Sequence, residues 1–258
     1  MKDVQPIRPL ISVVIATKGE RESLLRAIDS VLSQTFENWE IVIVSNVNSR
    51  MLHLLPTDPR IRIVHQIEGG IYQNFNLGID SSAGQYISIL NDDDWYAPNF
   101  LSAAIKTIIE NQCEVAYGDT LLFSGDGNAR FVKSKSKLFR GHLFDFLGAY
   151  HNTFLISKEC FVKYGQFMIH SNRGKELKLA SDYLWFVNAL QKGLRPVKST
   201  EILGNFTLGG ASSMSRLEMI REGKEIAVSC SRNCLEKCFV SVVWNFRLAY
   251  NLAKVYFR

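Results

Sequence analysis

Four short apolar runs near the start of the chain constrain its fold more than any other feature. They alternate with segments long enough to form helices, and the segment from Glu20 to Gln34 carries its apolar residues at helical spacing. Runs that are continuously apolar are typical of strands buried on both faces. The pattern predicts an α/β fold with a mostly parallel sheet flanked by helices. The four runs are Ile11–Ala16, Glu40–Val44, Ile61–Val64 and Tyr86–Leu90.

The later part of the chain has a different pattern. Beyond residue 115, shorter predicted strands mix with helices, and from Ser215 to Arg258 the chain is predicted to be mainly helical. Ligands of doubly wound sheets bind beyond the carboxyl ends of the strands. We therefore expect the chemistry just after Ala16, Val44 and Leu90, with the later part covering the sheet. The later strands are predicted at Val115–Phe123, Arg130–Val132, Thr153–Ile156 and Ile202–Leu208.

Composition excludes several classes of protein. The net charge of +5 is spread over 258 residues, which does not indicate nucleic-acid binding. The five cysteines lack paired C-x-x-C spacing, so we expect neither a disulfide framework nor a zinc ribbon, and a cytoplasmic location. We find no signal peptide and no run long enough to span a membrane. Cys230, Cys234 and Cys238 recur every four residues, and we interpret them as a buried stripe on one helix.

An acidic cluster, Asn91-Asp92-Asp93-Asp94, follows directly on the fourth apolar run. Adjacent carboxylates repel one another, and a hard cation such as Mg²⁺ or Mn²⁺ would relieve that repulsion. Such a cation can also bridge a diphosphate and stabilise it as it leaves. An acidic turn that caps the next helix, with Pro98 in the first turn, is the alternative interpretation.

Two other segments draw attention. Asp182 lies near the predicted N-terminus of an apolar helix, where it is either a functional carboxylate or an N-cap that satisfies backbone donors. Gly69 and Gly70 precede the fourth run, and paired glycines allow the backbone to approach a phosphate or a sugar closely. A plain turn followed by a helix is the alternative, and it is the simpler explanation of the glycines taken alone.

Taken together, residues 8 to 215 resemble the family 2 glycosyltransferases of the GT-A fold. The resemblance rests on six motifs in the same order as in the family. The first motif comprises Ile11–Thr17, Ala27–Thr35 and Trp39–Val44. The other five are Gly69–Gly78, Gly84–Trp95, His151–Phe154, Ala180–Tyr183 and Gly209–Ser212.

The resemblance implies an inverting enzyme that transfers a sugar from a nucleotide diphosphate to a saccharide or lipid-linked acceptor, in polysaccharide or lipopolysaccharide assembly. It implies that Asp182 is the general base and that Asp93 binds the metal. It also implies a catalytic domain over residues 1–214, with donor binding at about 8–115 and the acceptor side at 116–214, and an extension over 215–258. The expected donor contacts are Thr17, Ser45, Asn46, Gly70, Asn76, Asn91 and Asp92, and the acceptor side includes His151, Asp94 and Trp95.

Two positions depart from the family pattern. Asn91 replaces the leading aspartate that many members carry in the DxD motif, although its carbonyl oxygen remains a potential ligand. Ser45 and Asn46 stand where the family usually has aspartates that bind the base and ribose. These departures leave a catalytically inactive nucleotide-sugar binding module as the alternative function.

Other enzymes with a similar start do not fit the sequence. A dehydrogenase needs a G-x-G-x-x-G turn after the first strand, whereas the stretch from Thr17 to Glu22 contains one glycine. A nucleotidyltransferase needs a glycine-rich and basic phosphate loop at the same place, for which this stretch is a poor substitute.

The C-terminal segment, from Phe239 to Arg258, interleaves aromatic and aliphatic residues with basic ones. Such a helix lies on an anionic membrane surface, which would place the protein at the inner face of the membrane. Packing of the helix on the catalytic domain or on a second subunit is the alternative.

Overall fold

The computed structural model describes residues 8–46, 50–66, 68–125, 127–136, 143, 148–209 and 215–256, and the side chains of these residues up to 252. The described strands form one sheet in the order β3-β2-β1-β4-β8-β6-β9-β5, and β7 pairs with the outer part of β6. The strands are β1 (Ile11–Ala16), β2 (Trp39–Ser45), β3 (Ile61–His65), β4 (Tyr86–Ile89), β5 (Trp95–Tyr96), β6 (Val115–Phe123), β7 (Ala129–Val132), β8 (Leu155–Ser157) and β9 (Val197–Thr207).

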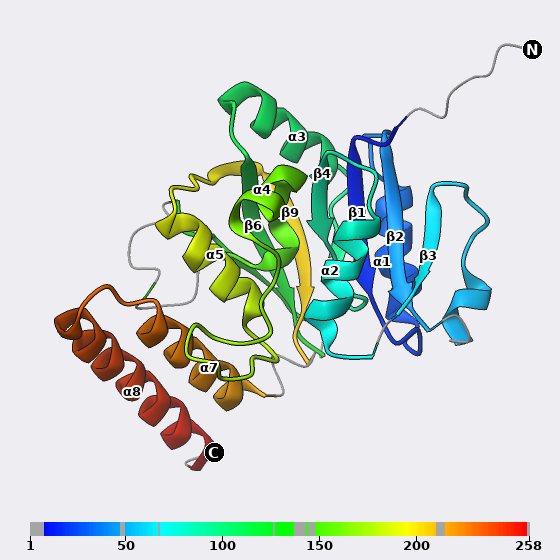
Figure 1. Cartoon of the computed structure of the whole chain (residues 1–258). Coiled ribbons are helices and arrows are strands. Elements are labelled where there is room, and N and C mark those ends of the chain that lie inside the picture. Colours follow the sequence, from blue (N-terminus) through cyan, green and yellow to red (C-terminus); the bar gives the residue numbers. More distant parts are fainter. Residues whose placement is uncertain are drawn as a thin grey trace, which may run out of the picture.

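The sheet joins two parts of different character. Strands β3, β2, β1 and β4 are parallel, whereas β8 is antiparallel to both β4 and β6, and β6 is parallel to β9. Helices cover both faces (Figure 1). The helices are α1 (Ser23–Leu32), η1 (Arg50–Leu54), α2 (Ile71–Ser81), α3 (Phe100–Asn111), η2 (His151–Thr153), α4 (Lys158–Tyr164), α5 (Ser181–Gln191), α7 (Arg216–Ser229) and α8 (Cys234–Tyr256).

Alternating side chains of the central strands pack into two separate hydrophobic cores, one on each face of the sheet. In β1, Val13 and Ile15 pack with α1 and α3 on one face, whereas Val14 packs with α2 and α5 on the other. This two-sided burial explains why β1 and β2 are continuously apolar, and it confirms the predicted α/β fold with a mostly parallel sheet. Strand β3 differs from the prediction because it forms an edge of the sheet, and none of its residues is fully buried.

Helix α2 lies unusually close to the sheet because Gly78 faces β1. A Cβ atom at Gly78 would lie 2.4 Å from Cγ1 of Val14 and 3.1 Å from Cγ2 of Val44. The close approach brings the first turn of α2, which begins directly after Gly70, over the carboxyl ends of these strands.

A buried carboxylate ties the amino ends of the parallel strands together. Glu40 on β2 accepts hydrogen bonds from Ser12 Oγ at 2.6 Å, from the Ala83 backbone N–H at 2.6 Å and from the Arg62 guanidinium at 2.8 Å. Burial alone would raise the pKa of Glu40, but these bonds outweigh it and lower the pKa. The network joins β1, β2, β3 and the start of β4, at the end of the sheet opposite the candidate site.

The C-terminal helices belong to the same packing unit as α5. Ile220, Ile226 and Ala227 of α7 are buried in the core that contains α5, and so are Val240 and Trp244 of α8. The interpretation of the cysteines as one helical stripe was wrong, because α7 ends at Ser229 and α8 begins at Cys234. Cys230 is buried between them, whereas Cys234 and Cys238 are exposed. No described helix is both long and apolar enough to cross a membrane.

Candidate functional site

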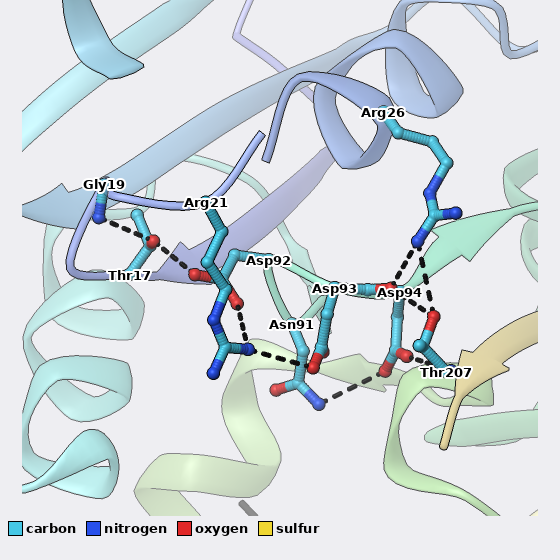
Figure 2. A network of polar contacts seen from close by, with 9 residues as sticks. All are labelled: Thr17, Gly19, Arg21, Arg26, Asn91, Asp92, Asp93, Asp94 and Thr207. Carbon is cyan, nitrogen blue, oxygen red and sulfur yellow. Dashed lines mark hydrogen bonds and ion pairs between the residues drawn. The ribbon is translucent and has the colours of Figure 1, made fainter. Parts of the chain in front are cut away.

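The carboxyl end of β1 leads into a loop that is bonded to the acidic cluster. The Thr17 N–H bonds the carbonyl of Val44 at 3.0 Å, which places Thr17 between β1 and β2. Its hydroxyl donates to Asp92 Oδ2 at 2.5 Å and accepts from the Gly19 N–H at 2.9 Å (Figure 2). Gly19 has a φ of 68°, a left-handed conformation that glycine adopts without strain. The predicted donor residues Thr17 and Asp92 are therefore brought together.

Asp92 and Asp93 both lie near one guanidinium group, that of Arg21. Nη1 of Arg21 is 3.2 Å from Asp93 Oδ2 and 3.9 Å from Asp92 Oδ1 (Figure 2). Burial raises the pKa of Asp93, the neighbouring Asp92 raises it further, and Arg21 opposes both effects. A carboxylate pair of this kind attracts positive charge.

The backbone of the acidic turn is fixed from two other elements. Arg26 of α1 donates to the Asp93 carbonyl at 2.9 Å, and the Thr207 hydroxyl at the end of β9 donates to the same carbonyl at 2.6 Å. The Arg26 guanidinium also lies over the ring of Trp95, 3.8 Å from its centroid. These contacts were not predicted from the sequence.

Asp94 differs from its predicted place on the acceptor side. Its side chain is fully buried, with Oδ1 accepting from the Thr207 N–H at 2.9 Å and Oδ2 from the Asn91 amide at 3.2 Å. Burial raises the pKa of Asp94 well above its ordinary value. We therefore interpret Asp94 as a structural residue whose hydrogen bonds hold the turn against β9.

The acidic turn fits a divalent cation of the kind that uses substrate oxygens as ligands. Mg²⁺ is commonly held by one or two carboxylates together with substrate phosphates and water. Within the described part of the chain, no group of three or more His, Cys, Asp or Glu side chains forms a complete metal site. Asp93 and Asp92 provide the one or two carboxylates that a phosphate-bridging cation requires.

Asp182 is held at the start of α5 by residues from two other elements. The N-cap position belongs to Ala180, so Asp182 lies inside the first turn and the N-cap interpretation does not hold. Its Oδ1 accepts from the Tyr72 hydroxyl at 2.9 Å and from the Tyr183 N–H at 2.8 Å. Its Oδ2 lies 3.6 Å from Nδ1 of His151 in η2.

His151 links the two acidic regions of the site. Burial lowers the pKa of His151, while Asp182 and Asp93 both raise it in part. Both carboxylates therefore lie within electrostatic reach of the same imidazole, although 89 positions separate them in the chain (182 − 93). The Nε2 atom of His151 is buried and has no protein hydrogen-bond partner among the described residues.

Other predicted donor residues have different surroundings. The amide of Asn76 donates to the Phe167 carbonyl at 2.9 Å and accepts from the Phe167 N–H at 3.1 Å, so both its ends are used inside the protein. A donor contact of Asn76 would therefore require its amide to release the Phe167 backbone. Gly70 is the N-cap of α2, and its N–H donates to Gln73 Oε1 at 2.6 Å.

Three further predicted features lie at the end of β2 and in the last motif: Ser45, Asn46 and the Gly209–Ser212 segment. Ser45 is fully buried at the end of β2 and Asn46 is exposed just beyond it. Most of the Gly209–Ser212 motif lies outside the described residues. Tyr72 is the main residue of the site that the sequence reasoning missed, although it lies within the recognised Gly69–Gly78 segment.

Comparison with known proteins identifies the family. The sequence model of glycosyl transferase family 2 matches residues 12–168, which carry the Thr17 loop, the acidic turn and His151. The chain belongs to this family.

Curated relatives of this family-2 chain match it over part of their length. The putative colanic acid biosynthesis glycosyl transferase WcaA of Escherichia coli is 37% identical over 100 residues, which are 36% of this chain and 36% of WcaA. Glycosyltransferase GlyG of Streptococcus pneumoniae is 32% identical over 129 residues, 47% of this chain and 43% of GlyG. An uncharacterized glycosyltransferase of Rickettsia typhi is 31% identical over 191 residues, 69% of this chain and 58% of the relative.

Solved structures confirm the GT-A-like fold of this family-2 chain. S. aureus TarS in complex with UDP-GlcNAc has a TM-score of 0.64 at 15% identity, and the match covers 91% of this chain and 70% of TarS in that structure. The mannosyltransferase PcManGT from Pyrobaculum calidifontis, in complex with GDP-Man and Mn²⁺, has a TM-score of 0.62 at 13% identity, covering 96% of this chain and 76% of PcManGT. At these identities the similarity establishes the fold.

Proposed function

We propose that this chain is a metal-dependent, inverting glycosyltransferase that moves a sugar from a nucleotide diphosphate to an acceptor hydroxyl. The observation that carries the proposal is that Asp182 Oδ2, from α5, lies 3.6 Å from Nδ1 of His151, while the charge of Asp93, from the β4–β5 turn, acts on the same imidazole. A cation-attracting carboxylate pair and an anchored carboxylate base, brought together at one end of a sheet, are the two groups that this reaction needs.

The donor is a nucleotide diphosphate-sugar bound beyond β1 and β2. Thr17 and Asp92, joined by a hydrogen bond, lie at this end of the sheet together with Ser45, Asn46 and Asn91. The complexes of TarS with UDP-GlcNAc and of PcManGT with GDP-Man, which share this fold, support a donor of this class.

Asp93, with Asp92 beside it, would hold the Mg²⁺ or Mn²⁺ ion. The ion supplies electrostatic stabilisation of the diphosphate as negative charge develops on the leaving oxygen. The Mn²⁺ in the PcManGT complex supports this choice of ion. Arg21 forms ion pairs with Asp93 and Asp92 in this structure. When the ion binds, Arg21 would move away from these carboxylates and remain close enough to contact the diphosphate.

Asp182 removes the proton from the acceptor hydroxyl as that oxygen attacks the anomeric carbon of the donor. The bond from that carbon to the diphosphate breaks in the same step, so the configuration inverts. Tyr72 holds Oδ1 of Asp182, which leaves Oδ2, on the side of His151, to accept the proton. His151 and Trp95 are proposed to border the acceptor, a saccharide or lipid-linked saccharide of polysaccharide or lipopolysaccharide assembly. The name of WcaA supports that setting.

We further propose that α8 places the enzyme on the inner face of the membrane. Its exposed apolar residues are spaced three or four apart and share one face: Leu235, Phe239, Val242, Phe246 and Tyr250. The opposite face, with Val240 and Trp244, packs on the protein, and α8 lies along the outside of the molecule beside α7 (Figure 1). The segment from residue 234 to 258 carries four basic residues and one acidic residue, which suits anionic lipid.

The proposal is tested by donor turnover with and without Mn²⁺. The wild-type protein should hydrolyse or transfer from UDP-GlcNAc or GDP-Man in the presence of Mn²⁺, and EDTA should stop the reaction. Asp93→Ala should fold normally, since its carboxylate lies at the rim of the sheet, and should lose the Mn²⁺-dependent increase in nucleotide affinity.

The matched control is Asp29→Ala on α1, which removes a carboxylate outside the site. Nucleotide binding without turnover would support the inactive binding module instead. Unchanged Mn²⁺-dependent affinity in Asp93→Ala would contradict the metal assignment.

A further inference from the structure

A buried carboxylate on α7 is bonded to the backbone that leads into the catalytic helix. Glu222 is 4% exposed. Its Oε1 accepts from the Lys178 N–H at 2.9 Å, and its Oε2 accepts from the N–H groups of Leu179 at 2.9 Å and Ala180 at 3.0 Å. Three successive backbone donors therefore converge on one side chain.

The bonded segment ends two residues before the base. Ala180 is the N-cap of α5, Ser181 is its first residue and Asp182 its second. A carboxylate at this place also interacts favourably with the positive end of the helix dipole. The Ser181 hydroxyl donates to the Met168 carbonyl, so the first turn of α5 is fixed on a second side.

A second carboxylate, one turn along α7, holds the other end of the same loop. Glu225 accepts from the Ser171 hydroxyl at 3.1 Å and lies 3.6 Å from Nη1 of Arg173. Helix α7 thus contacts the loop at 171–173 and again at 178–180. Its apolar residues Ile226 and Ala227 share the core with α5.

We infer that Glu222 is a positioning residue for Asp182, so that α7 forms part of the catalytic apparatus. The inference rests on the proposed function of Asp182. Fixing the backbone at 178–180 fixes the Cα position of Asp182 and hence the distance from Oδ2 to an incoming hydroxyl. A misplacement of about 1 Å at such a group costs on the order of 100-fold in rate.

Glu222→Gln is the most conservative variant that removes the carboxylate. A glutamine keeps the size of the side chain but offers one acceptor oxygen, and its NH₂ group would face a backbone N–H. The matched control is Glu218→Gln on the same helix, because Glu218 is exposed.

Hydrogen exchange tests the contact itself, without any need for activity. In Glu222→Gln the amides of residues 178–180 should exchange at least about tenfold faster than in the wild-type protein, while the strands of the sheet and the Glu218→Gln control keep their protection. Unchanged exchange at 178–180 would show that Glu222 does not hold this segment.

A double-mutant cycle tests the role, with Mn²⁺ and UDP-GlcNAc or GDP-Man, whichever the wild-type protein turns over. Glu222→Gln should lower kcat at least about tenfold, with the Kd for the nucleotide unchanged, and should cost nothing further in an Asp182→Asn background. A merely structural role would lower the rate by the same factor in both backgrounds, which would overturn the inference. If the wild-type protein turned over neither donor, the proposed function would fail, and the exchange result would still decide the contact.

Discussion

At the scale of single residues, the two oxygens of Asp182 have different surroundings. Oδ1 is engaged by the Tyr72 hydroxyl and the Tyr183 N–H, whereas Oδ2 lies near His151. Burial is the largest cause that raises the pKa of Tyr72, and the charge of Asp182 raises it further, so the phenol remains protonated and donates its hydrogen bond. Under the proposed function, this asymmetry would leave one oxygen of Asp182 for proton transfer.

Tyr72→Phe should therefore slow sugar transfer without weakening donor binding. A hydrogen bond to a charged group contributes about 1.5–3 kcal/mol, which corresponds to roughly 10- to 100-fold in rate if the bond positions the base. Steady-state kinetics and nucleotide titration measure the two effects separately. Tyr86→Phe, at the amino end of β4, serves as the control. An unchanged kcat in Tyr72→Phe would show that the bond does not position Asp182.

The roles assigned to Asp93 and Asp182 remain predictions, whereas the internal hydrogen bonds of the neighbouring polar residues were not predicted. Local pattern marked an acidic cluster after an apolar strand and a carboxylate near a helix start, but the resemblance to the family was needed to assign roles to Asp93 and Asp182. Asn76 and Asp94 look equally polar in the sequence, but their partners are the Phe167 backbone and the Thr207 N–H. Such partners are distant in the chain and cannot be read from local pattern.

At the scale of secondary-structure elements, the local sequence pattern predicted where strands form better than it predicted how exposed they are. Strand β1 begins and ends as predicted, with Pro9 shortly before it and the polar residues Thr17 and Lys18 directly after it. The predicted strand at Thr153–Ile156 begins instead as η2 and continues as β8 (Leu155–Ser157). The exposure of β3 depends on its place at the sheet edge, which its own residues do not encode.

The exposed face of α8 gives an element-scale prediction. Phe239→Ser combined with Phe246→Ser should weaken binding to vesicles that contain anionic lipid, because these side chains are 63% and 74% exposed. Full burial of one phenylalanine contributes about 1.5–3 kcal/mol, so losing two should reduce partitioning at least about tenfold. Vesicle cosedimentation at low salt measures the effect.

The control for this variant is Ile109→Ser, which removes an exposed apolar residue on α3. If the wild-type protein does not bind such vesicles, the membrane proposal is contradicted. If the wild-type protein is a dimer and the double variant is a monomer, the face is instead an interface between two copies of the chain.

At the scale of the whole molecule, the sheet joins the part proposed to bind the donor to the part proposed to bind the acceptor. The parallel strands β1, β2 and β4 carry Thr17 and lead into the acidic turn, while α5 and η2 carry Asp182 and His151. The predicted boundary at residue 214 does not coincide with an end of the core, because α7 contributes Ile220 and Glu222 to the interior. The sequence could not reveal this contribution, since α7 has no marked apolar face.

The most direct test of the account is Asp182→Asn, which separates donor binding from transfer. Asparagine retains an oxygen for the Tyr72 bond, so the thermal stability should be nearly unchanged. Mn²⁺-dependent nucleotide affinity should also be retained, because those contacts come from the other part of the sheet. Asparagine accepts no proton at neutral pH, and losing a positioned general base should slow single-turnover sugar transfer by at least about 100-fold. A folded Asp182→Asn variant that transfers sugar at nearly the wild-type rate would contradict the account.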